Sequence, residues 1–199
     1  MLFEVNGLCK RFGRIAALSG VSFQVNAGEV LGLIGPNGAG KSTLFECLGG
    51  VLPSDSGTVR SGGQPVGTRE RPSLLFYVPD GIAPWPAQSV RWALDFAIGF
   101  FGGQPALRDE VTDQLDLRPL LRQPIGTLSK GQRKRALLAI GLLTPQPALL
   151  IDEPLKDSTC GSRAILRRRY ARMQPAAGRS SSRFIKSAMP RASATGSCC

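Results

Sequence analysis

Histidine is absent from the 199-residue sequence, and its five cysteines carry no metal-ligand spacing. Cys9 and Cys47 are isolated, while Cys160, Cys198 and Cys199 lie towards the C-terminal end. Reduced thiols are therefore a better interpretation than a zinc site or a disulfide framework. No apolar run reaches the roughly 18 residues that cross a bilayer, and no signal-peptide pattern opens the chain. We expect a cytoplasmic protein with one domain of ordinary size.

Acidic residues are scarce, and the formal net charge at pH 7 is +11. Such a charge usually suggests nucleic acid or an anionic membrane surface as a partner. The excess is not evenly distributed, however. Residues 1–154 carry 15 Lys and Arg against 13 Asp and Glu, whereas residues 155–199 carry 10 against 1. The basicity therefore says nothing about what residues 1–154 bind.

Hydrophobic patterning predicts an α/β fold with a parallel core sheet. Residues 2–6 and 21–25 alternate like half-buried strands, with basic turn-like sequence between them, and 56–67 contain short strands that pair with them. The remaining expected elements are buried strands at 30–34, 73–80 and 148–152, helices at 41–48 and 135–143, and a helical insertion at 89–121 interrupted by 102–105.

A glycine-rich stretch, GPNGAGKS at residues 35–42, fits the phosphate-binding pattern of Gly, four residues, Gly-Lys-Ser. Glycines let successive backbone N–H groups surround phosphate oxygens, and the following helix adds its positive dipole end. Lys41 is expected to neutralise the β- and γ-phosphates, and the Ser42 hydroxyl to ligate Mg²⁺. The alternative is an ordinary Gly-rich turn, which the predicted strand before and helix after the motif disfavour. The predicted ATP-binding residues of this stretch are Gly35, Pro36, Asn37, Gly38, Ala39, Gly40, Lys41, Ser42 and Thr43.

Two adjacent acids, Asp152 and Glu153, end the apolar strand predicted at 148–152. Two acids at a strand end are often only a solvated turn. Given the phosphate-binding loop upstream, we expect Asp152 to hold Mg²⁺ and Glu153 to polarise the attacking water. Lys41 and Glu153 are thus the predicted catalytic residues.

The third motif, LSKGQRKR at residues 128–135, suggests a family. With the phosphate-binding loop and LLIDEP at 149–154, it resembles the ATP-binding cassette (ABC) transporter ATPases over about residues 2–154. The resemblance implies a P-loop NTPase fold with an N-terminal antiparallel β subdomain and a helical subdomain at about 87–140. It implies further that the signature residues contact the γ-phosphate held by an opposite subunit: Ser129, Lys130, Gly131 and Gln132. A helix start capped by Ser129 is compatible with that role.

The same resemblance implies ATP and Mg²⁺ as cofactors, a dimer of nucleotide-binding domains, and a membrane permease partner at the inner face of the membrane. Phe12 lies where the family stacks an aromatic ring on adenine, with a core phenylalanine as the alternative. Asp80 lies where the family usually has Gln. An acid there can meet Mg²⁺ or its waters, or it can be a plain strand-end acid.

After Pro154 the family pattern stops, because neither its Gly-Leu-Asp loop nor its γ-phosphate His follows. We interpret residues 155–199 as a shifted reading frame after a one-nucleotide deletion near codons 154 and 155. Codons allowed for 155–162 spell Glu-Gly-Leu-Asp in the neighbouring frame, and those for 182–187 spell Ser-Ile-His-Gln-Ile. We expect 1–154 to form the ATP-binding domain and 155–199 to be a disordered tail that supplies no substitute for the missing central strand.

The predicted function is the ATP-binding subunit of an ABC transporter, an ATP hydrolase whose activity in this chain is weak at best. An alternative is a non-hydrolysing ATP-binding or regulatory module, or an inactive truncated product. Nucleic-acid binding through the basic tail is disfavoured, because no aromatic residues are interleaved at stacking spacing. No specific nucleic-acid partner is expected, and the transported substrate is not encoded in these motifs.

Overall fold

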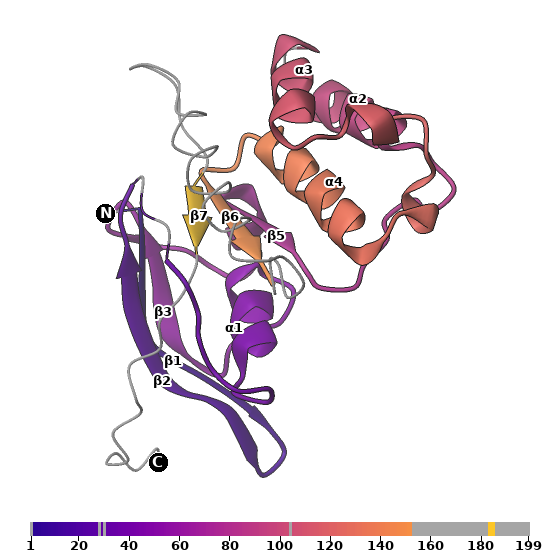
Figure 1. Ribbon diagram of the computed structural model, residues 1–199. Helices are drawn as coiled ribbons and strands as arrows, with labels where there is room; N and C mark the ends of the chain where they lie inside the picture. Colours follow the sequence, from indigo (N-terminus) through magenta and orange to yellow (C-terminus); the bar gives the residue numbers. More distant parts are fainter. Residues whose placement is uncertain (1, 28, 30, 104, 153–182, 186–199) are drawn as a thin grey trace.

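The computed structural model of the protein describes residues 2–27, 29, 31–103, 105–152 and 183–185 (Figure 1). These residues contain two β-sheets and four α-helices. The antiparallel sheet has the order β2-β1-β3-β4, and the parallel sheet has the order β5-β6-β7. The strands are β1 (Phe3–Phe12), β2 (Ile15–Val25), β3 (Ser56–Ser61), β4 (Gln64–Pro65), β5 (Leu75–Val78), β6 (Ala148–Ile151) and β7 (Arg183–Ile185). The helices are α1 (Lys41–Leu48), α2 (Val90–Phe101), α3 (Pro105–Gln114) and α4 (Lys130–Leu142), with 3-10 turns at Arg71–Ser73, Arg118–Leu120 and Ile125–Thr127.

The β1–β2 hairpin is longer than the hydrophobic alternation predicts. The strands continue through the basic sequence expected to be a turn, and only Gly13 and Arg14 lie between the facing residues Phe12 and Ile15. Gly13 has φ of 58°, the left-handed conformation that a two-residue hairpin loop requires at its first position. The pairing of β3 with β1 confirms the predicted pairing of 56–67 with the N-terminal strands.

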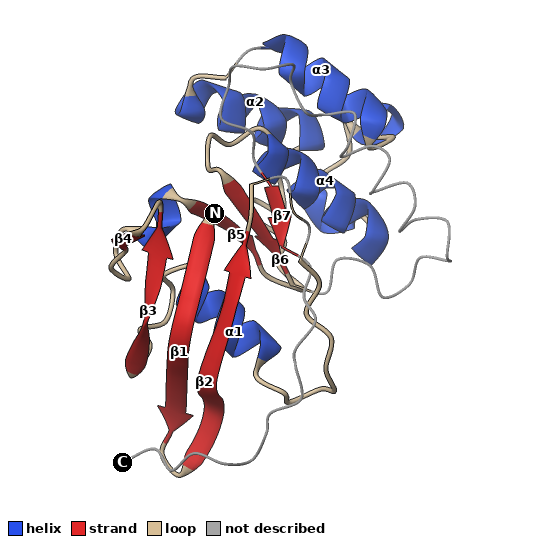
Figure 2. Cartoon of the chain, turned by 90° about the vertical axis from the view of Figure 1, so that its left-hand side faces the viewer, coloured by secondary structure: helices blue, strands red, loops and turns tan. Residues whose placement is uncertain are grey.

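Strand β6 is buried on both faces, and it separates two hydrophobic cores. Ala148 and Leu150 contribute to a core with the antiparallel sheet and α1, while Leu149 and Ile151 contribute to a core with the helices α2, α3 and α4. Figure 2 shows this layering, with α1 behind the antiparallel sheet and the helical group beyond β5 and β6. Alternate residues thus face opposite cores, which is why the strand is a continuous apolar run.

The helical group begins and ends at residues that favour these boundaries. The Ser89 hydroxyl accepts a hydrogen bond from Trp92 N, and Gly102 closes α2 in the left-handed conformation. Helix α4 begins five residues earlier than the apolar run predicts, because Ser129 and Gln132 form a reciprocal capping box at its start. The predicted helices at 41–48 and within 89–121 are confirmed by α1, α2 and α3.

The strand predicted at 30–34 is wrong for the residues described there. Leu31–Ile34 is assigned to no strand, and the Ile34 side chain is 76% exposed. An apolar run becomes a strand only where another strand offers backbone partners. In the described part of the chain, β6 already has β5 on one side and β7 on the other.

Strand β7 corrects a second expectation, that 155–199 would supply no strand. Its residues pair in parallel with β6, Ala148 facing Arg183 and Leu150 facing Ile185. Parallel pairing uses backbone groups that every residue carries, so the missing apolar alternation did not prevent it. The rest of the predicted disordered tail, residues 153–182 and 186–199, lies outside the described residues. The structure therefore does not test the reading-frame hypothesis.

Within the described residues, no helix is both long enough and apolar enough to span a bilayer. Among the described residues, Cys9 and Cys47 form no disulfide, and burial raises the pKa of Cys47.

Truncating β6 should destabilise the protein strongly. Leu150 is 0% exposed between the antiparallel sheet and α1, so Leu150→Ala should lower the free energy of unfolding in urea by about 2–5 kcal/mol. Ile15→Ala is the matched control, because the Ile15 side chain is 71% exposed; it should cost less than about 0.5 kcal/mol. Equal losses for the two variants would contradict the placement of β6.

Candidate functional site

The Lys41 ammonium group is hydrogen-bonded to the glycine-rich loop that precedes it. Lys41 Nζ donates hydrogen bonds to the carbonyl oxygens of Gly35 (2.9 Å) and Pro36 (2.7 Å). The side chain thus folds back over the loop that precedes α1. Pro36, Asn37 and Gly38 are exposed at the tip, while Gly35, Ala39, Gly40 and Thr43 are partly buried.

Gly40 anchors the end of this loop on β2. It has φ of 80°, and a Cβ atom there would lie 2.3 Å from the Ala17 carbonyl oxygen. Gly38 has nearly the same φ, 81°, but a Cβ atom there would meet nothing within 4 Å. Glycine at position 40 is therefore required by both backbone conformation and close packing, whereas position 38 requires it by conformation alone.

A hydrogen bond joins the loop to the end of β6. Ser42 Oγ donates to Asp152 Oδ2 at 2.6 Å, across 110 residues of sequence. Asp152 is 5% exposed, and its backbone N–H donates to Val78 O of β5 at 3.0 Å. The structure thus brings together Ser42 and Asp152, the two residues predicted to hold a metal ion.

The chemistry of these donors fits a hard cation. A hydroxyl and a carboxylate both offer oxygen, the ligand atom that Mg²⁺ prefers. Within the described ranges no cluster of three or more His, Cys, Asp or Glu side chains forms a metal site. Because Mg²⁺ is commonly held by one or two protein oxygens together with substrate phosphates and water, a two-residue donor set is sufficient.

Tyr77 is a partly buried residue close to the negative charges of this region. Its pKa lies well above the ordinary value, chiefly because the side chain is buried and also because Asp152, Glu46 and Asp80 are negatively charged nearby. Its ring packs at a tilt against Phe45 of α1, with 6.2 Å between centroids. Tyr77 therefore stays neutral and fills the space between β5 and α1.

Phe12 is not a core residue. It is 48% exposed at the end of the β1–β2 hairpin, and Lys10 Nζ lies 5.8 Å from the centre of its ring. Lys10 is itself paired with Asp55 at 2.8 Å. The alternative interpretation as a core phenylalanine is therefore wrong, and the ring is available for stacking.

The LSKGQ segment leads into α4, with Ser129, Lys130 and Gly131 exposed, Gln132 partly buried and Leu128 buried. The Ser129 hydroxyl accepts a hydrogen bond from Gln132 N (3.3 Å), and Gln132 Oε1 accepts one from Ser129 N (2.9 Å). A Cβ atom at Gly131 would meet nothing within 4 Å, so packing within this chain does not require glycine there. In the described part of the chain, none of the hydrogen bonds or ion pairs joins this segment to the glycine-rich loop.

Asp80 lies between two lysines of α4. Its carboxylate is 3.1 Å from Lys130 Nζ and 2.8 Å from Lys134 Nζ. Burial opposes ionisation, but the hydrogen bonds from Lys134 and Lys130 outweigh it, and the pKa of Asp80 is lowered. Among the described residues, Asp80 thus forms its ion pairs with two lysines of α4 and has no such contact with the Ser42–Asp152 pair. Glu153, the predicted base, lies outside the described residues.

A row of exposed aromatic rings lies along α2 and the loop before it, and the sequence patterns did not predict it. Its members, the aromatic ladder, are Trp85, Trp92, Phe96 and Phe100, with 5.2 Å between the stacked rings of Trp92 and Phe96 and 5.9 Å between those of Phe96 and Phe100. Phe100 is 72% exposed. The spacing 92, 96, 100 was the available signal, because residues four apart share a helix face. Helical periodicity alone did not distinguish the buried apolar face of α2, which includes Ala93 and Leu94, from its exposed aromatic face.

Comparison with known proteins agrees with these motifs. A family profile described as "ABC transporter" matches residues 18–156. The chain is 34% identical over 175 residues to the cytochrome c biogenesis ATP-binding export protein CcmA of Paracoccus denitrificans, covering 86% of this chain and 78% of CcmA. It is 31% identical over 159 residues to the linearmycin resistance ATP-binding protein LnrL of Bacillus subtilis, covering 77% and 51% of the two chains. The chain thus spans about half to three quarters of these relatives.

Solved structures show the same fold. The structure of an ATP-binding subunit of an ABC transporter superposes with a TM-score of 0.76 at 23% identity, over 94% of this chain and 80% of that one. A putative ABC transporter ATP-binding protein from Pyrococcus furiosus gives a TM-score of 0.75 at 21% identity, over 96% and 94%. The two-sheet and helical arrangement is therefore that of an ATP-binding cassette, as the motifs predicted.

Alanine at the two loop glycines should separate backbone strain from collision. Gly38→Ala should lower the free energy of unfolding by about 1–2 kcal/mol, the cost of a left-handed non-glycine residue. Gly40→Ala adds the collision with Ala17 O and should cost at least about 1 kcal/mol more. Urea denaturation of the two variants measures the difference. Indistinguishable stabilities would show that the loop does not pack against β2 in this way.

Proposed function

Since the chain belongs to the ABC transporter family, we propose that it is the ATP-binding subunit of an ABC transporter, a hydrolase that uses Mg-ATP to drive a membrane partner. The observation that supports this most is the hydrogen bond between Ser42 and Asp152 beside the Lys41 loop. Together with Lys41, this bond gives one end of α1 a hydroxyl, a carboxylate and an ammonium group, which supports the binding of a nucleoside triphosphate with Mg²⁺ there.

Lys41 is proposed to exchange its carbonyl partners for phosphate oxygens. The two carbonyl oxygens that it now contacts are neutral acceptors. The ammonium group is charged with either partner, but an anionic phosphate oxygen adds Coulomb attraction that a neutral carbonyl oxygen lacks. A β- or γ-phosphate entering the loop therefore competes well for Nζ, and the backbone N–H groups of Gly38 to Ser42 add further donors.

Ser42 and Asp152 are proposed to hold Mg²⁺ through their oxygens. A bound Mg²⁺ ion supplies positive charge that offsets the negative charge of the transferring phosphoryl group. Their mutual hydrogen bond joins the hydroxyl to the carboxylate, and the Asp152 N–H to Val78 O bond holds the Asp152 backbone against β5. Glu153 is proposed as the base that activates water, one residue beyond Asp152.

Phe12 is proposed to stack on adenine, because its ring is half-exposed at the end of the hairpin. The exposed segment from Ser129 to Gln132 is proposed to contact the γ-phosphate of a nucleotide held by a second copy, so that two copies enclose two nucleotides. The space around Gly131 supports this, because among the described residues a Cβ atom there would meet nothing within 4 Å, and glycine allows close approach of another molecule.

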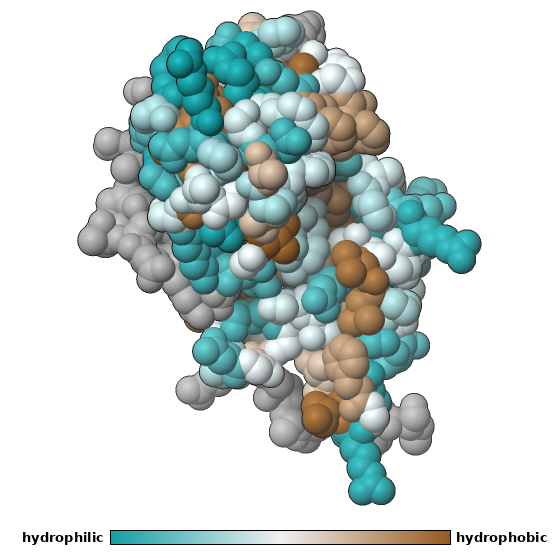
Figure 3. All heavy atoms as spheres, turned by 90° about the vertical axis from the view of Figure 1, so that its right-hand side faces the viewer, coloured by the Kyte–Doolittle hydropathy of each residue, from teal (hydrophilic) through white to brown (hydrophobic). Residues whose placement is uncertain are grey.

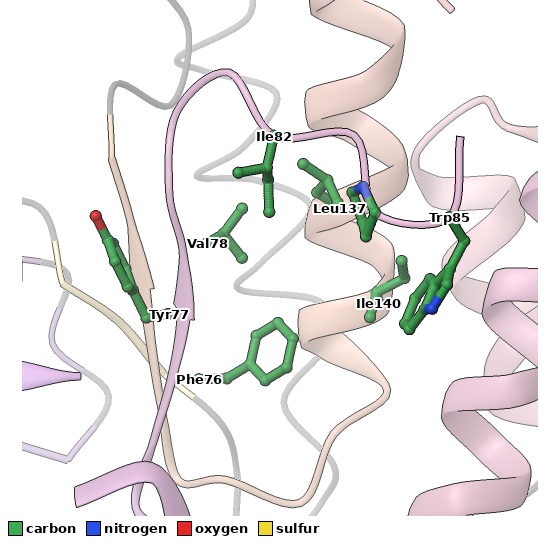
Figure 4. A pocket seen from close by; sticks show the side chains of 8 residues that line it. Phe76, Tyr77, Val78, Ile82, Trp85, Leu137 and Ile140 are labelled. Carbon is green, nitrogen blue, oxygen red and sulfur yellow. The ribbon is translucent and has the colours of Figure 1, made fainter. Parts of the chain in front are cut away.

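A membrane permease is proposed to cover the apolar surface near the aromatic ladder. A pocket of about 120 Å³ lies beside the ladder, lined by Phe76, Tyr77, Val78, Ile82, Pro84, Trp85, Leu137 and Ile140. Figure 4 shows Phe76, Val78, Ile82 and Leu137 directed towards this pocket, with the Tyr77 ring on the other side of β5. Apolar side chains interrupt the hydrophilic surface in Figure 3, and such patches mark interaction sites. Association with a permease would place the chain at the inner membrane face.

Removing the loop lysine tests nucleotide binding. Lys41→Ala should weaken ATP binding by roughly 100-fold, because two charge-assisted hydrogen bonds are lost. Arg60→Ala, which removes an exposed positive charge from β3, is the matched control and should leave affinity within about twofold. Isothermal titration of the full chain with Mg-ATP measures both.

The same titration separates the alternatives. Absence of ATP binding by the unmodified chain would refute the proposal, whereas binding without phosphate release would favour the non-hydrolysing module. Steeply salt-dependent binding to DNA that is lost on removing residues 155–199 would favour the nucleic-acid alternative.

The metal role of Asp152 gives a separate prediction. Asp152→Asn keeps an oxygen that accepts from Ser42 but removes the negative charge, so Mg²⁺ should no longer strengthen ATP binding. In the unmodified chain, adding Mg²⁺ to an EDTA-treated sample should raise affinity by about tenfold or more. Nucleotide titrations with and without Mg²⁺ compare the two proteins. An undiminished Mg²⁺ effect in Asp152→Asn would exclude the carboxylate as a ligand.

A further inference from the structure

One carboxylate connects the end of β5 to the first two turns of α4. Asp80 lies two residues beyond Val78, the last residue of β5, and it pairs with both Lys130 and Lys134. The lysines are four residues apart, so their side chains emerge from the same helix face. In Figure 1 the chain that leaves β5 runs beneath the end of α4 where this face begins.

Helix α4 needs a negative charge at this end. Its first residues include Lys130, Arg133, Lys134 and Arg135, and its first turn contains no acidic residue. Cations near the positive end of a helix dipole are destabilising. The capping box satisfies backbone hydrogen bonds but adds no charge. Asp80 supplies the missing negative charge from another element.

The two ion pairs differ in exposure. The Lys134 side chain is 11% exposed, and the Lys130 side chain is 51% exposed. Solvent and salt screen an exposed pair strongly and a sheltered pair much less. The Lys134–Asp80 pair at 2.8 Å is therefore the stronger tether, and Lys130–Asp80 at 3.1 Å is the weaker one.

We propose that Asp80 is a positioning residue, which ties the start of α4 to the sheet edge that carries Asp152. The tether acts on Ser129, Gly131 and Gln132 through α4, while β5 holds Asp152 through the Asp152 N–H to Val78 O bond. The orientation of the exposed signature segment is thus fixed relative to the Ser42–Asp152 pair. The importance of the Asp80 tether for ATP turnover rests on the proposed function, whereas the existence of the tether does not.

Hydrogen exchange of the full chain tests the tether directly. Asp80→Asn should speed amide exchange over Arg133–Leu137 by roughly threefold to tenfold, because the start of α4 loses its counter-charge. Asp95→Asn is the matched control, since Asp95 pairs with Arg108 between α2 and α3; it should leave α4 unchanged. Asp80→Asn should add little to Lys134→Met, and Asp80→Lys with Lys134→Glu should restore protection.

Two exchange results would overturn the proposal. One is unchanged exchange in Asp80→Asn. The other is an equal effect of Asp80→Asn in the unmodified and Lys134→Met backgrounds, which would mean that the two side chains act independently. Nucleotide titration adds a third, because loss of the Mg²⁺ effect in Asp80→Asn would make Asp80 a metal ligand instead.

Steady-state ATP hydrolysis tests the consequence. Asp80→Asn should lower kcat about tenfold while the Kd for ATP stays within twofold, and the charge-swapped pair should recover kcat. A purely structural role would not separate kcat from Kd or allow recovery. If the unmodified chain hydrolyses no ATP, the proposed hydrolytic function fails, and the exchange comparison still decides the tether.

Discussion

The burial of β6 on both faces is the constraint on which the rest of the structure depends. Its four residues divide between two cores, and one core consists of the antiparallel sheet and α1 while the other contains the helical group. A strand in this position cannot slip by one residue, because the slip would exchange every side chain between the two cores. The register of β6 therefore determines where Asp152 emerges. Asp152 continues the alternation of Ala148 and Leu150, which face the core that contains α1, and it reaches Ser42 at the start of that helix.

Parallel pairing then gathers the functional side chains at one sheet edge. Val78 of β5 faces Ile151 of β6, so Asp80 and Asp152 follow neighbouring strands at their carboxyl ends. Ligands of open α/β sheets bind at this edge, because the loops that leave the strands are there. Gly40 brings the glycine-rich loop to the same region by close contact with β2. The candidate site is thus assembled from loops whose positions are set by packed strands and by one helix.

Motif chemistry could be predicted from the sequence wherever local rules decide it. The residues around Lys41 predict a loop before a helix. Ser129 and Gln132 are typical of a capping box, and the apolar run at 148–151 predicts a buried strand. The run at 31–34 is just as apolar but forms no strand, because strand formation requires a neighbour that local sequence does not encode. For the same reason β7 was unforeseen. The pairing of Asp80 with α4 was also hidden, since it joins residues 50 positions apart.

Charge balance at this edge explains why the two acids are arranged differently. Neither α1 nor α4 has an acidic residue in its first turn, so a negative charge at the positive end of either helix has to come from another element. Asp80 pairs with Lys130 and Lys134 of α4 and offsets part of the positive charge at that end. Asp152 instead accepts a hydrogen bond from the Ser42 hydroxyl, and among the described residues Lys41 Nζ donates to the carbonyl oxygens of Gly35 and Pro36. Among the described residues, the Lys41 ammonium group thus has carbonyl rather than carboxylate partners, so an anion that binds it displaces no carboxylate from Lys41.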